Sequence, residues 1–534
     1  MSETPVSALA DASIDEDIAT LHKMGYGQEL LRRMSGFSNY AISMSIICIL
    51  AGCVTSFHIA FSSVGGAAIG LGWLFSCLIS LCFALNMGQL ASAHPTAGGI
   101  YHWASILGGK GWGWATAWIN LIGMITVLAA INVGTYLFAL SSFGSLLGLS
   151  AMGAQQALLM QFGVVTLITL SQALLNHKGI RLTTMLTDFS GWWILIVSAL
   201  LTIAMFFFAP THDFSRLWTF TNYSGAAGGN VWPANSSLSW LFLLGLLLPI
   251  YTVTGFDASA NTSEETIGAA RTVPKAIVQA VVISGVAGWI MLCSFVMAAP
   301  DMNQAAAQGA SALTWIMGKV LPAPLPLVFY AAIVIAQYLC GLATLTSASR
   351  MVYAFARDGG LPFSGRLKQV SASHRTPSAA IWTVAVLSIL FTAYTPVYVT
   401  MTVICSLFLY ISYMLPAALG FIKYGRSWTE MGPWTLGRFY RPIAAICVLG
   451  CGLFFVIGIQ PPNDKALTVT LIIGALMLVC WFGYIRKVFH GPPLGKEVEA
   501  RLEEIEEVER KVGQTGDLKP ITGKLGTHPS EPAV

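Results

Sequence analysis

Residues 249–261 combine residue types that are unusual within so apolar a stretch: Pro-Ile-Tyr-Thr-Val-Thr-Gly-Phe-Asp-Ala-Ser-Ala-Asn. Pro249 and Gly255 both interrupt helices, and an interruption frees backbone N–H and C=O groups. An acid at membrane depth costs about 2.5 to 3.5 kcal/mol on insertion scales and usually faces a cavity or a proton path. The segment therefore predicts a small ligand held by backbone groups, with Asp257 as a proton-coupling candidate.

A second segment, residues 43–52, is also rich in small and polar residues, including Ser43, Ser45, Cys48 and Gly52. Two interrupted helices would together expose helix amide ends, which favour a carboxylate, and carbonyl ends, which favour an ammonium group. A small zwitterion fits that arrangement. The alternatives are that Gly and Pro only kink a membrane helix, and that Asp257 is a helix N-cap.

The composition of the chain indicates which kind of secondary structure positions these residues. Of the 534 residues, 55% are apolar and 10% are charged, against roughly 25% charged residues in a soluble domain. A soluble fold is excluded, and a net charge of +4 scattered along the chain excludes a nucleic-acid partner. The stretches without charged residues are long enough for helices of about 20 residues, which cross a bilayer.

We predict an all-α integral membrane protein with twelve transmembrane helices. Their expected spans are 38–61, 67–91, 114–140, 155–175, 188–209, 238–262, 276–299, 325–355, 377–394, 397–422, 442–460 and 466–486. With both termini in the cytoplasm, only Arg216, Lys319 and Lys465 of the 28 Lys and Arg residues lie outside, as the positive-inside rule expects. The expected location is the cell membrane, taken as a bacterial inner or plasma membrane.

The interrupted spans are the first and the sixth, which correspond if the first ten helices form two inverted five-helix repeats, as in many secondary transporters. The expected division is a cytoplasmic tail (1–33), a first repeat (34–210), a second repeat (211–425), two further helices (426–490) and a cytoplasmic tail (491–534).

Common catalytic signatures are missing from the sequence. The ten cysteines lack the paired spacing of a zinc or CxxC site, and no P-loop, HExxH or GxSxG motif occurs. A membrane enzyme would also need a partner for Asp257, and no His or second acid lies beside it in the sequence. We therefore expect no enzyme activity, no metal and no organic cofactor.

Three separated blocks resemble the amino acid–polyamine–organocation transporters, most closely their amino acid and choline (4-aminobutyrate permease-like) branch. They are Pro-Thr-Ala-Gly-Gly-Ile-Tyr-His-Trp at 95–103, Gly-Phe-Asp to Pro-Lys at 255–275, and Ser-Arg-Met-Val-Tyr-Ala-Phe-Ala-Arg-Asp-Gly-Gly-Leu-Pro at 349–362, followed by Thr-Pro at 376–377. The resemblance implies the five-plus-five inverted repeat of the bacterial leucine transporter, with discontinuous first and sixth helices.

Carried over residue by residue, the resemblance implies a substrate site at the two interruptions. Its residues would be Ser45, Ile46, Ile47 and Cys48 in the first helix, and Tyr251, Thr252, Val253 and Thr254 in the sixth. Tyr251 would cover the substrate, the following residues would contact its amine, and Asp257 would relay a proton.

Further polar residues suggest coupling and gating. Thr344, Thr346 and Ser347 could supply oxygen ligands to a sodium ion, although interhelical hydrogen bonds explain such residues as well. The matching loops carry Glu264 and Glu265 in one, and Arg350 and Arg357 in the other. We expect ion pairs that close the cytoplasmic side; the alternative is solvated loop charges.

These features predict a secondary transporter for amino acids or related small amines such as 4-aminobutyrate. Proton symport with alternating access is the favoured coupling, and sodium is the other candidate ion. Alternatives are a choline or polyamine transporter, an amino acid exchanger, and a nutrient sensor with a transporter fold. The expected partners are the substrate and the lipid bilayer, and the oligomeric state stays open.

Overall fold

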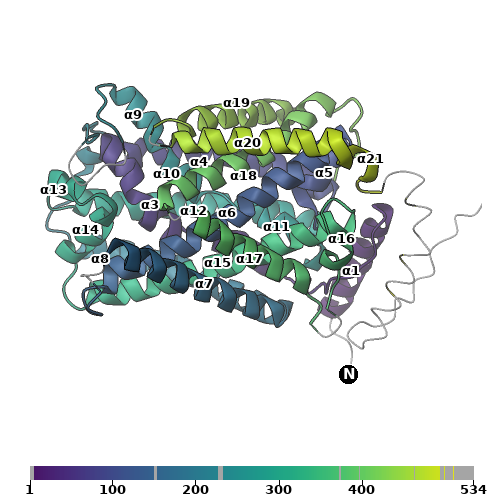
Figure 1. The fold of residues 1–534 in the computed structure, drawn as a ribbon, viewed down its shortest axis with the longest axis horizontal. Coiled ribbons are helices and arrows are strands. Elements are labelled where there is room, and N and C mark those ends of the chain that lie inside the picture. Colours follow the sequence, from purple (N-terminus) through teal and green to yellow (C-terminus); the bar gives the residue numbers. More distant parts are fainter. Residues whose placement is uncertain are drawn as a thin grey trace, which may run out of the picture.

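The computed structural model describes residues 5–149, 153–225, 232–371, 374–395, 397–461 and 463–493, together with 498, 505 and 509. Most helices run along the long axis of the molecule (Figure 1). The described residues form no β-sheet, only two isolated bridges, Met34 with Thr266 and Tyr424 with Trp428. The predicted all-α class is therefore confirmed.

The helices follow the predicted spans closely. The longer ones are α1 (Pro5–Lys23), α2 (Gly36–Ile47), α3 (Ile49–Val64), α4 (Trp73–Ala93), α5 (Gly99–Gly108), α6 (Lys110–Phe143), α7 (Ala154–His177), α8 (Ile180–Phe208), α9 (Leu238–Gly245), α12 (Ala269–Ala298), α14 (Ala312–Val320), α15 (Leu325–Arg357), α17 (Ser378–Tyr394), α18 (Tyr398–Lys423), α19 (Tyr440–Gly458) and α20 (Asp464–Cys480). The shorter ones are η1 (Ala68–Gly72), η2 (Phe214–Leu217), α10 (Leu247–Thr252), α11 (Ala258–Asn261), η3 (Ser263–Glu265), α13 (Met302–Ala307), η4 (Gly309–Ser311), α16 (Ser364–Leu367), η5 (Gly437–Phe439), η6 (Trp481–Ile485) and α21 (Arg486–Val488).

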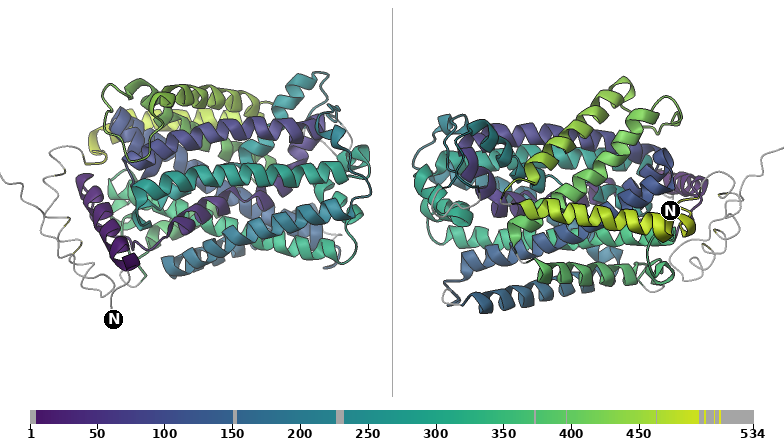
Figure 2. Two further views of the ribbon diagram at one scale, coloured as in Figure 1. Left: turned by 180° about the vertical axis from the view of Figure 1, so that it is seen from behind. Right: turned by 45° about the horizontal axis from the view of Figure 1, so that its top comes forward.

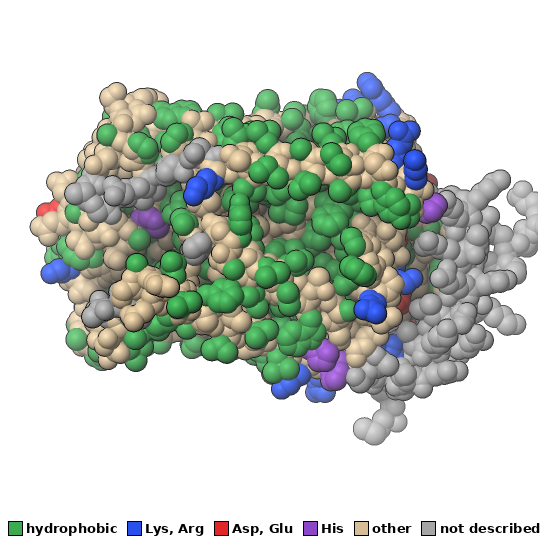
Figure 3. Space-filling model, in the orientation of Figure 1, with side chains coloured by type: hydrophobic (Ala, Val, Ile, Leu, Met, Phe, Trp, Pro, Cys, Tyr) green, Lys and Arg blue, Asp and Glu red, His purple; other side chains and the backbone are tan. Residues whose placement is uncertain are grey.

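Ten helical segments of the described chain are long and apolar enough to cross a membrane. Residues 238–252 and 378–394 form two shorter apolar helices at the remaining predicted spans. On the face drawn in Figure 3, hydrophobic side chains cover the middle, and most Lys and Arg side chains lie toward the end that carries α1. The chain is thus a multi-pass membrane protein; twelve crossings and the inverted repeat remain predictions.

Both predicted interruptions are present. Cys48 separates α2 from α3 and has φ of 20°, a value that L-residues rarely adopt. Residues 253–257 separate α10 from α11, with Gly255 at φ of 84°. Glycine adopts this left-handed conformation without a steric penalty, so the chain can turn sharply at this point.

A buried amide network joins three helices beside the interruptions. The Asn132 and Gln172 side chains of α6 and α7 exchange hydrogen bonds of 2.9 and 3.0 Å. Asn176 donates to the Leu342 carbonyl oxygen of α15 and accepts from the Thr346 hydroxyl at 2.7 Å. Because each amide has several partners, α6, α7 and α15 are held together as one scaffold.

The N-terminal segment forms a helix that the sequence did not predict. α1 lies across one end of the bundle, seen most clearly from behind in Figure 2. The Asp17 carboxylate accepts the N–H groups of Gly268 and Ala269 at 2.7 and 3.0 Å, at the start of α12. A carboxylate is favoured there because the first N–H groups of a helix are unpaired. The end that carries α1 is called the N-terminal end below.

Candidate substrate site

The two interruptions lie directly against each other. A Cβ atom built on Gly255 would lie 2.2 Å from Ile46 Cγ2, and one built on Gly52 would lie 2.6 Å from Thr252 Oγ1. The Ser43 hydroxyl donates to the Phe256 carbonyl oxygen at 2.9 Å and accepts the N–H of Ser259 at 3.0 Å. Two glycines thus allow the half-helices to approach each other closely, and hydrogen bonds hold them in register.

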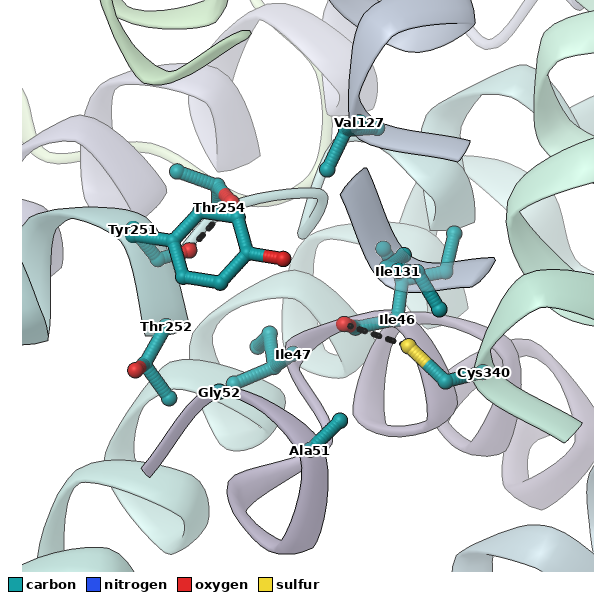
Figure 4. Close-up of a pocket in the computed structure, with 10 residues that line it drawn as sticks. All are labelled: Ile46, Ile47, Ala51, Gly52, Val127, Ile131, Tyr251, Thr252, Thr254 and Cys340. Carbon is teal, nitrogen blue, oxygen red and sulfur yellow. Dashed lines mark hydrogen bonds between the residues drawn. The ribbon is translucent and has the colours of Figure 1, made fainter. Parts of the chain in front are cut away.

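A small pocket lies at this junction (Figure 4). Its lining residues are Ile46, Ile47, Ala51, Gly52, Val127, Ile131, Tyr251, Thr252, Thr254 and Cys340. The free space inside it is about 10 Å³, enough for about one water molecule, so a substrate would enter only when the lining residues move apart. In Figure 4 the Tyr251 ring faces the pocket from one side, and Cys340 and Ile131 face it from the other.

Five of the eight predicted contact residues line the pocket: Ile46, Ile47, Tyr251, Thr252 and Thr254. The other three lie around it. The Ser45 hydroxyl is 3.4 Å from the Thr187 carbonyl oxygen, Cys48 Sγ is 3.7 Å from that of Ala336, and the Val253 carbonyl oxygen accepts from Tyr410.

The pocket hydroxyls also stabilise the broken helix. Thr252 donates to the Leu248 carbonyl oxygen at 2.9 Å, and Thr254 donates to that of Tyr251 at 2.8 Å. Since their hydrogens are engaged, both hydroxyls present oxygen lone pairs as acceptors. Acceptors of this kind would suit an ammonium group.

Asp257 is fully buried and does not cap α11, since its side chain makes no cap hydrogen bond. Instead it accepts the Tyr413 hydroxyl at 2.6 Å and contacts the Asn120 amide nitrogen at 3.4 Å. The same Tyr413 oxygen accepts the N–H of Gly255 at 3.1 Å. The Asp257 carboxyl group, at the end of the interruption, is therefore linked to the Gly255 N–H through one hydroxyl.

Two tyrosines of α18 pair the backbone groups that the interruption frees. Tyr410 donates to the Val253 carbonyl oxygen at 2.9 Å, and Tyr413 accepts from Gly255. In a membrane such freed groups need internal partners. The sequence did not predict a role for these two tyrosines, for Asn120 or for Cys340. For the tyrosines, the signal in the sequence was a Tyr pair spaced by three residues in a span without charged residues.

The three hydroxyls predicted as a cation site all have hydrogen-bond partners within the protein. Thr344 donates to the Cys340 carbonyl oxygen at 2.9 Å, within its own helix. Thr346 donates to the Asn176 side chain, and Ser347 Oγ accepts from the Asn261 amide at 3.0 Å. Thr346 and Ser347 thus make the interhelical bonds that the alternative describes, whereas Thr344 bonds within α15.

The predicted loop charges form buried ion pairs rather than solvated charges. Glu264 and Arg357 make two hydrogen bonds of 2.8 and 3.0 Å, and Glu265 pairs with Arg350 at 3.1 Å. Burial alone would raise the pKa of Glu264. The Arg357 guanidinium and the N–H of Ala97 stabilise the charged carboxylate more strongly than burial disfavours it, so the pKa of Glu264 lies below its usual value.

The N-terminal segment covers these pairs. The N–H groups of Arg33 and Met34 donate to the Glu265 carbonyl oxygen at 2.9 and 2.8 Å. The Tyr26 ring lies 3.9 Å from the Arg357 guanidinium carbon, and the Tyr26 hydroxyl donates to Asp358 at 2.8 Å. The sequence predicted residues 1–33 as a cytoplasmic tail, without a role at these ion pairs.

Gly255→Ala is expected to lower transport at least tenfold. An alanine would meet Ile46 and would also be strained at φ of 84°. Initial uptake rates in liposomes and thermal stability in detergent measure the effect. Gly474→Ala is the matched control, because no atom lies within 4 Å of the Cβ added there. Equal uptake by both variants would contradict a requirement for the close approach.

This arrangement, two interrupted helices around a small pocket in a multi-pass bundle, is that of a membrane transporter. Comparison with known proteins agrees. Residues 34–482 match the family described as amino acid permease. The chain therefore belongs to the amino acid permease family.

Similar proteins occur in plants and fungi. An Arabidopsis thaliana protein, amino-acid permease BAT1, is 28% identical over 90% of this chain and 96% of its own length. An uncharacterised amino-acid permease of Schizosaccharomyces pombe is 28% identical over 94% of this chain and 91% of its own length. A Candida albicans protein named provisionally as a polyamine transporter is 28% identical over 92% of both chains.

These relatives are named as permeases and transporters, not enzymes, which confirms the prediction that the chain is not an enzyme. Because they are eukaryotic, they give no support to a bacterial inner membrane as the location.

Proposed function

We propose that this permease is a secondary active transporter for amino acids or related small amines such as 4-aminobutyrate, coupled to protons. The observation that carries the proposal is the pocket between the two helix interruptions, with the Asp257 carboxyl linked to one of them through Tyr413. Backbone groups at the interruptions would bind a zwitterion, and Asp257 would take up and release the proton.

Alternating access would follow from the predicted inverted repeat. The interrupted helices α2–α3 and α10–α11 would move against the scaffold that the Asn132 and Gln172 network holds together. The buried pairs at the N-terminal end would then form the cytoplasmic gate. Both termini in the cytoplasm agree with the excess of Lys and Arg at this end.

A polyamine transporter is the second candidate. The name of the Candida relative favours it, and the Tyr251 ring and Asp257 could attract a cation. We favour the zwitterion because none of the described residues that line the pocket is acidic. A polyamine carries two or more positive charges, and Asp257, the acid linked to the interruption, already accepts the Tyr413 hydroxyl.

Uptake by purified protein in liposomes tests the proposal. The panel contains 4-aminobutyrate, several α-amino acids, choline and putrescine, each with an imposed proton gradient, a sodium gradient or neither. We expect accumulation of an amino acid or 4-aminobutyrate with the proton gradient alone. Accumulation that needs sodium would contradict proton coupling, and uptake of putrescine alone would favour the polyamine candidate.

Two further outcomes would replace the proposal. Uptake that requires unlabelled substrate inside the liposomes would indicate an exchanger. Saturable binding without flux under any gradient would indicate a sensor that keeps the transporter fold.

A further inference from the structure

A second cavity lies at the N-terminal end, between the residues that precede α2 and the first turns of α8. Its volume is about 500 Å³, and it opens to the outside of the bundle. It is lined by Arg33, Ile180, Arg181, Thr184, Met185 and Asp188. None of these residues lines the pocket at the helix interruptions.

The cavity is charged but incompletely paired. Arg33 and Arg181 are exposed, and within the described part of the chain neither guanidinium group has a hydrogen-bond or ion-pair partner. Asp188 Oδ2 accepts the Ser38 hydroxyl at 3.0 Å, whereas its buried Oδ1 has no partner among the described residues. The two guanidinium groups could thus bind an anion, and Asp188 Oδ1 could accept a hydrogen bond from a donor group.

An apolar stripe continues from the cavity along the outside of α8. Met185, Phe189, Trp192 and Ile196 are 61%, 47%, 56% and 52% exposed. Their spacing of three and four residues places them on one face of the helix, one turn beyond Arg181. In a membrane-spanning helix such a face contacts lipid chains.

We propose that this cavity binds an anionic phospholipid with a hydroxyl-bearing headgroup. Its phosphate would lie between Arg33 and Arg181, because guanidinium groups bind phosphate oxygens with paired hydrogen bonds. A headgroup hydroxyl would donate to Asp188 Oδ1, and an acyl chain would follow the stripe. Basic pockets between helices at the cytoplasmic surface are typical sites for anionic headgroups.

The bound lipid would act on the gate. Arg33 precedes α2, and its backbone N–H already bonds to Glu265 beside the buried ion pairs. A phosphate shared by Arg33 and Arg181 would tie the start of α2 to α8 and favour the closed cytoplasmic side. This inference concerns a separate site and does not depend on the identity of the transported substrate.

Native mass spectrometry of the full-length protein with defined lipids tests the site. We expect phosphatidylglycerol to be retained at least fivefold more than phosphatidylcholine, and more than phosphatidylmethanol, which has the same charge but no headgroup hydroxyl. Equal retention of all three lipids would overturn the proposal. So would full displacement by soluble glycerol 1-phosphate, because that result would identify a phosphate site without a role for the chains.

Variants test whether Arg33, Arg181 and Asp188 form the lipid site. Arg181→Gln and Arg33→Gln are each expected to lower phosphatidylglycerol retention at least fivefold, whereas Arg366→Gln, which removes a charge on α16 outside the cavity, should not. Equal losses in all three variants would indicate diffuse attraction and overturn the site. Asp188→Ala should abolish the preference over phosphatidylmethanol. Ser38→Ala is the control, because it keeps the Asp188 carboxylate and removes the hydroxyl that bonds to Asp188 Oδ2 and to Ser35.

Discussion

Asp257→Asn is expected to abolish proton-driven accumulation, with steady-state uptake in liposomes at least tenfold lower, while exchange of internal for external substrate continues. Asparagine has almost the same shape, and its amide oxygen can still accept the Tyr413 hydroxyl that Asp257 accepts at 2.6 Å. It cannot carry a proton at any physiological pH. The pocket would remain intact, and only the coupling would be lost.

Two controls accompany this variant. Asp213→Asn removes an acid that is paired with Arg216 far from the pocket, and it should leave accumulation unchanged. Tyr413→Phe removes the hydroxyl that links Asp257 to Gly255, so a partial loss of coupling is expected. Accumulation by Asp257→Asn at the level of the unmodified protein would show that the proton uses another group.

Glu264→Gln is expected to open the N-terminal end and lower transport at least tenfold. Removing one partner of a buried ion pair leaves the other charge buried and unpaired, which costs about 3 to 5 kcal/mol; here the remaining charge is Arg357. Cys340 is a native thiol on the pocket wall. Its alkylation by N-ethylmaleimide, resolved by mass spectrometry, should become several-fold faster.

The charge exchange Glu264→Arg with Arg357→Glu is the matched control, because it keeps one charge of each sign at the two positions. It should restore slow alkylation at least in part. If Glu264→Gln changes neither the alkylation of Cys340 nor transport, the pair does not close the cytoplasmic side.

Acid should have little effect on the Glu264–Arg357 ion pair until the pH is low. The pKa of Glu264 lies below its usual value, so the carboxylate stabilises the closed pair fully above the unfolded pKa of about 4.3. That contribution is lost only as the pH falls below this value toward the folded pKa. The ratio of the Cys340 alkylation rates of the Glu264→Gln variant and the unmodified protein should therefore stay constant within about twofold between pH 5.5 and 8, because the thiolate fraction rises with pH in both proteins alike.

The membrane segments and both interruptions could be predicted because each depends on neighbouring residues. A stretch of about 20 uncharged residues predicts a span by itself. Gly255 beside a run of polar residues predicts an interruption for a similarly local reason. The helix bounds differ from the predicted spans by a few residues at most ends, and most at α8, which begins at Ile180 instead of 188.

The partners of Asp257 could not be predicted because they are distant in the sequence. Asn120 is 137 residues away and Tyr413 is 156 residues away, and both lie in spans that read as ordinary apolar helices.

Hydroxyl residues in helices are ambiguous for another reason. They donate readily to the carbonyl four residues before them, as Thr344 does to Cys340, so their presence alone does not distinguish a cation site.

The contacts of the N-terminal segment also have a consequence for biosynthesis. Tyr26 leaves the ribosome long before Asp358, its hydrogen-bond partner, which lies 332 residues further along the chain. At about 5 to 20 residues per second, roughly 17 to 66 s separate the two. The segment must stay undocked at the membrane surface during this time, so the permease can close its N-terminal end only after most of its helices have been synthesised.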